Sequence, residues 1–241
     1  MKTKRKKSHS KGCAIDVAGV NKYYNRGLPS EVHVLKDINV CFEAGAFISI
    51  MGPSGSGKTT LLDIIGSLMK PSSGKVFLGG VDTSNLSEDK LAEIRRKTIG
   101  FIFQQYNLVQ SFTALENVEL ALRIGGKSRG EAKQRAAKLL EIVGLSHRLN
   151  NRPNQMSGGE QQRVAIARAL SNEPKVILGD EPTGNLDTKT GNKILDLLKN
   201  LNREERYTVI TVTHDPEVSK IADKVVRLRD GVIVSGRNKA K

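Results

Sequence analysis

The chain has 241 residues, of which 38% are hydrophobic and 27% charged, with 23 Gly and 7 Pro. This composition is typical of a globular protein and excludes a disordered or collagen-like chain. No apolar run approaches the roughly 20 residues that cross a bilayer, and no apolar signal core follows the basic N-terminus. We therefore expect a cytoplasmic protein. Cys13 and Cys41 do not make the pattern of a disulfide framework or a metal site, and we expect neither.

The net charge of +14 is concentrated at the two ends of the sequence. Residues 1–11 hold six Lys or Arg and no acid, and residues 237–241 hold three more basic residues, which leaves +5 for the rest. We interpret residues 1–12 as a basic, disordered leader and residues 237–241 as a basic tail, on either side of a domain at 13–236. The sequence has no Trp and shows no basic-aromatic pattern suited to stacking on bases. We therefore expect no specific nucleic-acid partner.

Strands and helices alternate along the chain. In chain order, the expected elements are strands at 14–20, 32–42 and 47–51, a helix at 59–68, a strand at 75–78, a helix at 86–97, a strand at 99–103, helical residues from 114 to 149 broken at Gly125, a strand at 175–180, a helix at 189–202, a strand at 208–213 and a helix at 216–222. This alternation predicts one α/β domain with a mainly parallel sheet covered on both faces, and a helical insert at about 105–170.

A glycine-rich sequence follows the third expected strand. Residues 52–59 match the phosphate-binding loop G-x-x-x-x-G-K-[ST], in which backbone N–H groups and a helix N-terminus surround phosphate oxygens. We expect Lys58 to reach the β- and γ-phosphates, Thr59 to ligate Mg²⁺ and Thr60 to bond the α-phosphate. The predicted nucleotide-binding residues are Gly52, Pro53, Ser54, Gly55, Ser56, Gly57, Lys58, Thr59 and Thr60.

Two carboxylates end the apolar strand at 175–180. After a phosphate loop, such a pair is typical of a nucleotide hydrolase: the first acid holds Mg²⁺, usually through water, and the second polarises the attacking water. We therefore interpret Asp180 as the metal acid and Glu181 as the general base. By itself, an acid at a strand end is often only the cap of the next helix.

A second glycine motif lies about twenty residues before Asp180. Residues 156–163, Met-Ser-Gly-Gly-Glu-Gln-Gln-Arg, resemble the signature motif of ATP-binding cassette (ABC) ATPases. The resemblance implies that Ser157, Gly158 and Gly159 bind the γ-phosphate of an ATP held by an opposing copy of the chain. An N-capped helix with a flexible entry also explains these three residues when they are taken alone.

Four further positions match the same family and extend the resemblance over about residues 13–236. Tyr24 resembles the aromatic residue that stacks on adenine, with Tyr23 as its neighbour. Gln104 matches a catalytic-site glutamine that senses Mg²⁺ and faces the membrane partner, although the adjacent Gln105 leaves the choice open. Asp187 resembles the loop acid that crosses the dimer interface. His214 matches the switch histidine that contacts the γ-phosphate.

Sequence details resemble one group within the family, the macrolide-export and lipoprotein-release (MacB/LolD-like) ATPases. These details lie at residues 103–108, 113–119, 180–187 and 230–231, whereas Met156, Glu160 and Gly179 depart from the usual residues. The resemblance implies a P-loop core with an antiparallel β subdomain and a helical signature subdomain. It also implies a homodimer that closes around two ATP–Mg²⁺ and drives a separate membrane permease, peripheral on the inner face of the cell membrane. The alternative is a non-transport ABC ATPase, either a mechanical or signalling module or an iron–sulfur assembly factor.

Overall fold

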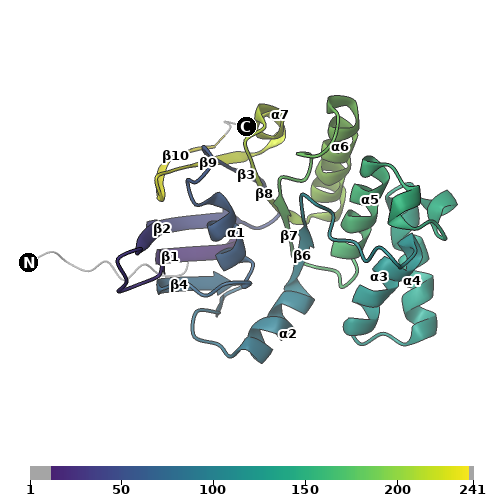
Figure 1. Cartoon of the computed structure of the whole chain (residues 1–241), viewed down its shortest axis with the longest axis horizontal. Helices are drawn as coiled ribbons and strands as arrows, with labels where there is room; N and C mark the ends of the chain where they lie inside the picture. Colours follow the sequence, from purple (N-terminus) through teal and green to yellow (C-terminus); the bar gives the residue numbers. More distant parts are fainter. Residues whose placement is uncertain (1–11, 239–241) are drawn as a thin grey trace, which may run out of the picture.

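The computed structural model describes residues 12–238 (Figure 1). The predicted leader, apart from Gly12, and residues 239–241 of the predicted tail lie outside this range. Strand β10 runs to Asn238, two residues beyond the predicted end of the domain at 236. Within residues 12–238, no helix has the length and apolar character needed to cross a bilayer.

The smaller of two sheets is built by the N-terminal third of the chain. Its four antiparallel strands lie in the order β2-β1-β4-β5. Their bounds are β1 (Cys13–Tyr24), β2 (Val32–Glu43), β4 (Ser73–Leu78) and β5 (Val81–Asp82). This sheet is the expected antiparallel β subdomain.

The larger sheet has six strands in the order β10-β9-β3-β8-β7-β6. All neighbours from β9 to β6 are parallel, and β10 alone is antiparallel to its neighbour. The strands are β3 (Phe47–Met51), β6 (Ile99–Ile102), β7 (Val176–Asp180), β8 (Thr208–Thr213), β9 (Lys224–Arg229) and β10 (Val232–Asn238). The carboxyl ends of the parallel strands share one edge, which is where ligands bind in open α/β sheets.

Helices cover the larger sheet and form a separate group beyond its β6 edge. They are α1 (Lys58–Ile65), α2 (Glu88–Thr98), α3 (Ala114–Ile124), α4 (Arg129–Ile142), α5 (Gly158–Ala169), α6 (Thr188–Glu205) and α7 (Pro216–Ile221), with 3-10 turns η1 (Ser146–Arg148) and η2 (Pro153–Gln155). Figure 1 shows α3, α4 and α5 together at one end of the molecule. This group is the expected helical subdomain.

Each helix of that subdomain begins with a capping box. The side chain of a Thr or Ser accepts the N–H of a Glu three residues later, and that Glu carboxylate accepts the N–H of the capping residue. The pairs are Thr113 with Glu116, Ser128 with Glu131, and Ser157 with Glu160. The second box explains why the expected helical stretch at 114–149 divides into α3 and α4.

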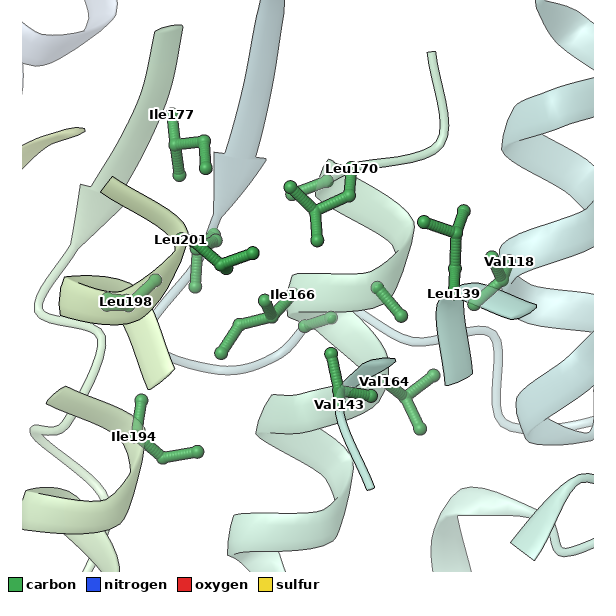
Figure 2. Close-up of a cluster of buried hydrophobic side chains, with 14 of the residues drawn as sticks. Val118, Leu139, Val143, Val164, Ile166, Leu170, Ile177, Ile194, Leu198 and Leu201 are labelled. Carbon is green, nitrogen blue, oxygen red and sulfur yellow. The ribbon is translucent and has the colours of Figure 1, made fainter. Parts of the chain in front are cut away.

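Successive residues of a central strand face opposite sides of the larger sheet, as strand geometry requires. Ile177 of β7 packs in the cluster that contains α5 and α6, whereas Leu178 packs in the cluster that contains α1. Figure 2 shows the first cluster, with Ile166 on the α6 side of α5 and Val164 on the side of α3 and α4. Burial of each such side chain contributes roughly 1.5–3 kcal/mol, so α5 is fixed firmly between the sheet and the helical subdomain.

The two cysteines form a disulfide, so the expectation that they form none is wrong. Cys13 of β1 and Cys41 of β2 have Cα atoms 5.6 Å apart, within the range that a disulfide spans. The antiparallel register pairs Asp16 with Cys41 and Cys13 with Glu43, and it shifts between Cys13 and Ile15. The strand pairing brings the two thiols together across 28 residues of sequence.

Candidate active site

The loop at residues 52–57 leads from β3 directly into α1. A Cβ on Gly52 would lie 2.1 Å from the carbonyl oxygen of Leu228, so only glycine fits the first position. Gly57 has a φ of 98°, a left-handed conformation that glycine adopts without steric cost, and it is the N-cap residue of α1. The two glycines therefore allow the tight turn that wraps this loop around the start of the helix.

The polar groups of this loop suit a polyanion. Lys58 is largely buried, and its Nζ donates to the carbonyl oxygen of Pro53 at 2.9 Å. The Ser56 hydroxyl is buried and has no hydrogen-bond partner within residues 12–238. Over the same residues, no side chain caps α1, which leaves the N–H groups of its first turn for a ligand. A cation, a hydroxyl and uncapped amides around one turn are what a phosphate chain requires.

Carboxylates gather beside this loop at the end of β7. Burial raises the pKa of the Asp180 carboxyl, and the charge of Glu181 raises it further. The charge of Lys58 and a hydrogen bond with Thr59 lower the same pKa and offset part of this rise. Burial also raises the pKa of Asp63, with a contribution from Asp180. The Asp180 carboxylate and the Thr59 hydroxyl are oxygen donors of the kind that Mg²⁺ prefers.

Glu181 is held in a rare backbone conformation at the carboxyl edge of the sheet. Its φ is 43°, in the left-handed region that non-glycine residues seldom adopt. Its N–H donates to the carbonyl oxygen of Val212 in β8 at 2.9 Å, and its own carbonyl oxygen accepts the N–H of Gly184 at 3.0 Å. The Oε1 of Glu181 lies 2.8 Å from Nδ1 of His214, whose ring is mostly exposed. The strained backbone thus directs the carboxylate toward His214.

Gln104 approaches the same carboxylate from the end of β6. The Nε2 of Gln104 and the Oε2 of Glu181 lie 2.9 Å and 3.1 Å from the point that a Cβ on Gly184 would occupy. The Gln104 carbonyl oxygen also accepts a hydrogen bond from Asn185 at 2.9 Å. Gln105 is exposed, whereas Gln104 is half-buried. The geometry favours Gln104 over Gln105 as the glutamine of this site.

The signature motif lies elsewhere on the chain. Ser157 caps α5, and Figure 1 shows α5 beyond β6 and β7 from α1. A Cβ on Gly159 would lie 2.4 Å from Cγ2 of Thr190, so α5 and the start of α6 approach closely there. Asp187 caps α6 by accepting the Thr190 N–H at 3.0 Å, and this bonding lowers the pKa of Asp187. The structure therefore groups Asp187 with the signature motif.

Tyr24 stands at the end of β1 with its ring partly exposed. Its hydroxyl donates to Sδ of Met69 at 3.3 Å. The neighbouring Tyr23 is stacked on His33, with ring centroids 3.9 Å apart. Because Tyr23 already has an aromatic partner, Tyr24 is the better candidate for stacking on a base.

The structure thus brings the phosphate loop, Asp180, Glu181, His214 and Gln104 to one edge of the sheet, apart from the signature motif. Gln162, which no sequence motif predicted, is fully buried in α5 and donates to the carbonyl oxygen of Pro182 at 2.6 Å. This bond connects the signature helix to the loop that follows Glu181. A polar residue at a core position of α5 was the available signal.

Comparisons of the sequence with known families and proteins agree on one family. Residues 35–184 match the family described as ABC transporter. An uncharacterized ABC transporter ATP-binding protein of Methanocaldococcus jannaschii is 51% identical over 225 residues, which are 93% of this chain and all of that protein. The macrolide export ATP-binding/permease protein MacB of Rhodopirellula baltica is 50% identical over 221 residues, which are 91% of this chain but 32% of that protein.

Solved structures give the same result for the fold. A dimeric structure of the ATP-binding cassette MJ0796 in a post-hydrolysis state, bound to ADP and Pi, superposes with a TM-score of 0.86 at 46% identity. The match covers 94% of this chain and 99% of that one. The fold expected from the sequence, a P-loop ABC ATPase core with its two subdomains, is confirmed. The chain belongs to the ABC transporter family, as an ATP-binding subunit that hydrolyses ATP.

Proposed function

We propose that two copies of this chain close around two ATP molecules and hydrolyse them to drive a separate membrane permease of the MacB/LolD-like type. The observation that carries the proposal is the Glu181 carboxylate, fixed 2.8 Å from His214 and directly after Asp180 at the carboxyl edge of the sheet. MJ0796 was solved as a dimer bound to ADP and Pi, which supports the two-copy arrangement.

The chain's own residues divide the chemistry between binding and proton transfer. Lys58 and the N–H groups of the phosphate loop bind the β- and γ-phosphates. Glu181 accepts a proton from water as the water oxygen attacks the γ-phosphorus and the bond to the ADP oxygen breaks. His214 orients the Glu181 carboxylate. Thr59, Gln104 and Asp180 are the residues that would hold Mg²⁺, which neutralises phosphate charge when bound.

Each ATP site needs a second copy to be complete. Ser157, Gly158 and Gly159 lie at the start of α5, which is beyond β6 and β7 from the phosphate loop and α1, so we propose that they bind the γ-phosphate held by the other copy. Asp187, grouped with them, would lie at the same interface. Tyr24 would stack on the adenine, on the side of the site formed by the small sheet.

A groove beside Gln104 offers a place for the permease. Its volume is about 300 Å³, and Arg96, Phe101, Phe103, Asn107 and Arg168 are among its lining residues. Relatives named as MacB are ATP-binding/permease proteins, and this chain spans about a third of their length. We propose that another chain supplies the permease and that this subunit works at the inner face of the cell membrane.

Mixing two inactive variants tests the two-chain site. Ser157→Arg places a bulky cation where the other copy's γ-phosphate must lie, and Lys58→Ala weakens phosphate binding. Each variant alone is expected to be nearly inactive. A mixed dimer contains one site with an intact phosphate loop and an intact signature motif, so ATPase activity should partly return. A mixture no more active than its components, at concentrations where the unmutated protein dimerises with ATP, would count against the proposal.

A further inference from the structure

Glu160 is a signature-motif residue that departs from the usual residue at its position, and its carboxylate has two sets of partners. Oε2 accepts the Ser157 N–H at 2.8 Å and the Ser157 hydroxyl at 3.0 Å. Oε1 accepts from Nε of Arg148 at 2.8 Å. Arg148 belongs to η1, so this ion pair connects the end of the α4 segment to the N-terminus of α5.

In the part of the chain that the structure describes, the other capping boxes of the helical subdomain form without an ion pair to the capping carboxylate, although the capping bonds and, from a greater distance, the charges of Arg152 and Lys127 lower the pKa of Glu116 and Glu131. Glu116 and Glu131 make the same bonds to Thr113 and Ser128 at the starts of α3 and α4. Within residues 12–238, neither carboxylate has a Lys or Arg nitrogen within 4.0 Å, the limit for an ion pair. The ion pair to a capping carboxylate thus occurs at the helix that carries the signature motif.

The position of Glu160 creates an electrostatic conflict. The Glu160 carboxylate is hydrogen-bonded to Ser157, beside the hydroxyl and N–H groups that are proposed to bind a phosphate. The negative charges of the carboxylate and of that phosphate would repel each other. Hydrogen bonds from Ser157 and the neighbouring Arg148 lower the pKa of Glu160, so the carboxylate stays ionised at neutral pH. Glu160 and Arg148 are both partly buried, so screening by water is incomplete.

We propose that Arg148 is a positioning residue for the two-chain ATP site. It neutralises the Glu160 carboxylate beside Ser157, so that the signature motif can accept the γ-phosphate of the opposing copy. This inference rests on the proposed dimer. Arg148 itself does not touch the nucleotide: it acts through Glu160, and its importance depends on the charge of that residue.

A double-mutant cycle separates this charge role from simple packing. The measurements use full-length chains that carry Glu181→Gln to block hydrolysis, and they determine the dimerisation constant with ATP and Mg²⁺ by sedimentation. Arg148→Ala should weaken the dimer by about tenfold or more, since each dimer contains two signature motifs and tenfold is about 1.4 kcal/mol. Glu160→Gln keeps the shape and a capping oxygen, so it should change the constant little. When Glu160→Gln is combined with Arg148→Ala, the dimerisation constant should return to within about threefold of the parent's.

Two further variants control for folding and position. Arg148→Lys keeps the positive charge, so its dimerisation constant should stay within about threefold of the parent's. This holds even if Arg148→Ala also disturbs the fold. Arg135→Ala removes an arginine of the same subdomain, one that pairs with Glu173 beyond the other end of α5, and should not affect dimerisation.

The outcomes distinguish this inference from the proposed function. If the Glu181→Gln parent forms no ATP-dependent dimer, the proposed function fails. If the parent dimerises and Arg148→Ala dimerises equally well, the role of Arg148 is overturned and the proposed function stands. The role is also overturned if the Arg148→Ala, Glu160→Gln pair remains as weak as Arg148→Ala alone, because the contact would then be structural.

Discussion

At the scale of single residues, Glu181 combines backbone strain with its proposed role as the general base. A left-handed φ at a non-glycine residue costs on the order of 1 kcal/mol, and it persists where surrounding bonds fix it. Here the Glu181 N–H donates to the carbonyl oxygen of Val212, and the Glu181 carbonyl oxygen accepts the N–H of Gly184. The same strain holds the carboxylate beside His214, so the conformation serves the site at the expense of local stability.

Replacing Glu181 by Gln should separate binding from hydrolysis. Glutamine keeps the shape and a hydrogen bond to His214 but cannot accept the proton from water, so ATP turnover should fall by about 10²-fold or more. ATP should still bind, and a dimer held by unhydrolysed ATP should accumulate on size-exclusion chromatography with ATP and Mg²⁺. Near-normal turnover by this variant would show that another group is the base.

The ionised Asp180 carboxylate should lower the free energy of unfolding when no Mg²⁺ is bound. Its pKa is raised, chiefly by burial and then by the charge of Glu181, so the ionised form is less favourable in the folded than in the unfolded chain. Asp180→Asn should therefore raise the melting temperature of the nucleotide-free protein at neutral pH, by about 2 °C or more, and weaken Mg²⁺-dependent ATP binding. The folded carboxyl takes up its proton at a higher pH than the unfolded one, so the stability difference should shrink as the pH is lowered. A variant less stable than the parent at neutral pH would contradict this assignment of the charge.

At the scale of elements, the disulfide between β1 and β2 joins the two longest strands of the small sheet. Closing a loop of 28 residues is expected to stabilise the folded state by about 2–4 kcal/mol. The double variant Cys13→Ser, Cys41→Ser should lose that amount in denaturant unfolding under oxidising conditions. Under reducing conditions, which prevail in the cytoplasm, it should match the unmutated protein. If a reductant leaves the unfolding midpoint of the unmutated protein unchanged, the disulfide contributes nothing.

Elements with a strong apolar pattern were predictable and those with mixed patterns were not. The strand at 208–213 is entirely buried, and its predicted bounds are those of β8. Strands β9 and β10 were missed. β9 is a six-residue strand near the edge of its sheet, and three of its residues are basic, so its apolar content is low. The disulfide depends on the pairing of β1 with β2, which no local pattern records.

The same division applies to the candidate site. The phosphate loop and Asp180 with Glu181 were predictable, because each motif stands at the junction of a strand with a turn. The contact of Gln104 with the Glu181 region, and the Arg148 pair with Glu160, join residues that are distant in sequence. The first contact follows from the way the chain packs at the edge of the sheet and the second from packing within the helical subdomain, and a single sequence specifies neither.

At the scale of the whole molecule, the phosphate loop and the signature motif belong to different parts. The loop lies where the two sheets meet at α1, and the signature motif opens α5 in the helical subdomain (Figure 1). In the proposed dimer the halves of one ATP site come from different copies, so closing the dimer would itself be the step that completes the site. Loss of the γ-phosphate would remove the contacts that keep it closed.

The dependence of specific ATPase activity on protein concentration tests this two-chain site most directly. The unmutated protein would be assayed at saturating ATP and Mg²⁺, from well above its measured dimerisation constant to far below it. A site shared between two copies predicts that activity per chain falls steeply with dilution, as the fraction of dimer falls. Activity per chain that stays flat over that whole range would contradict the shared site and show that one chain hydrolyses ATP alone.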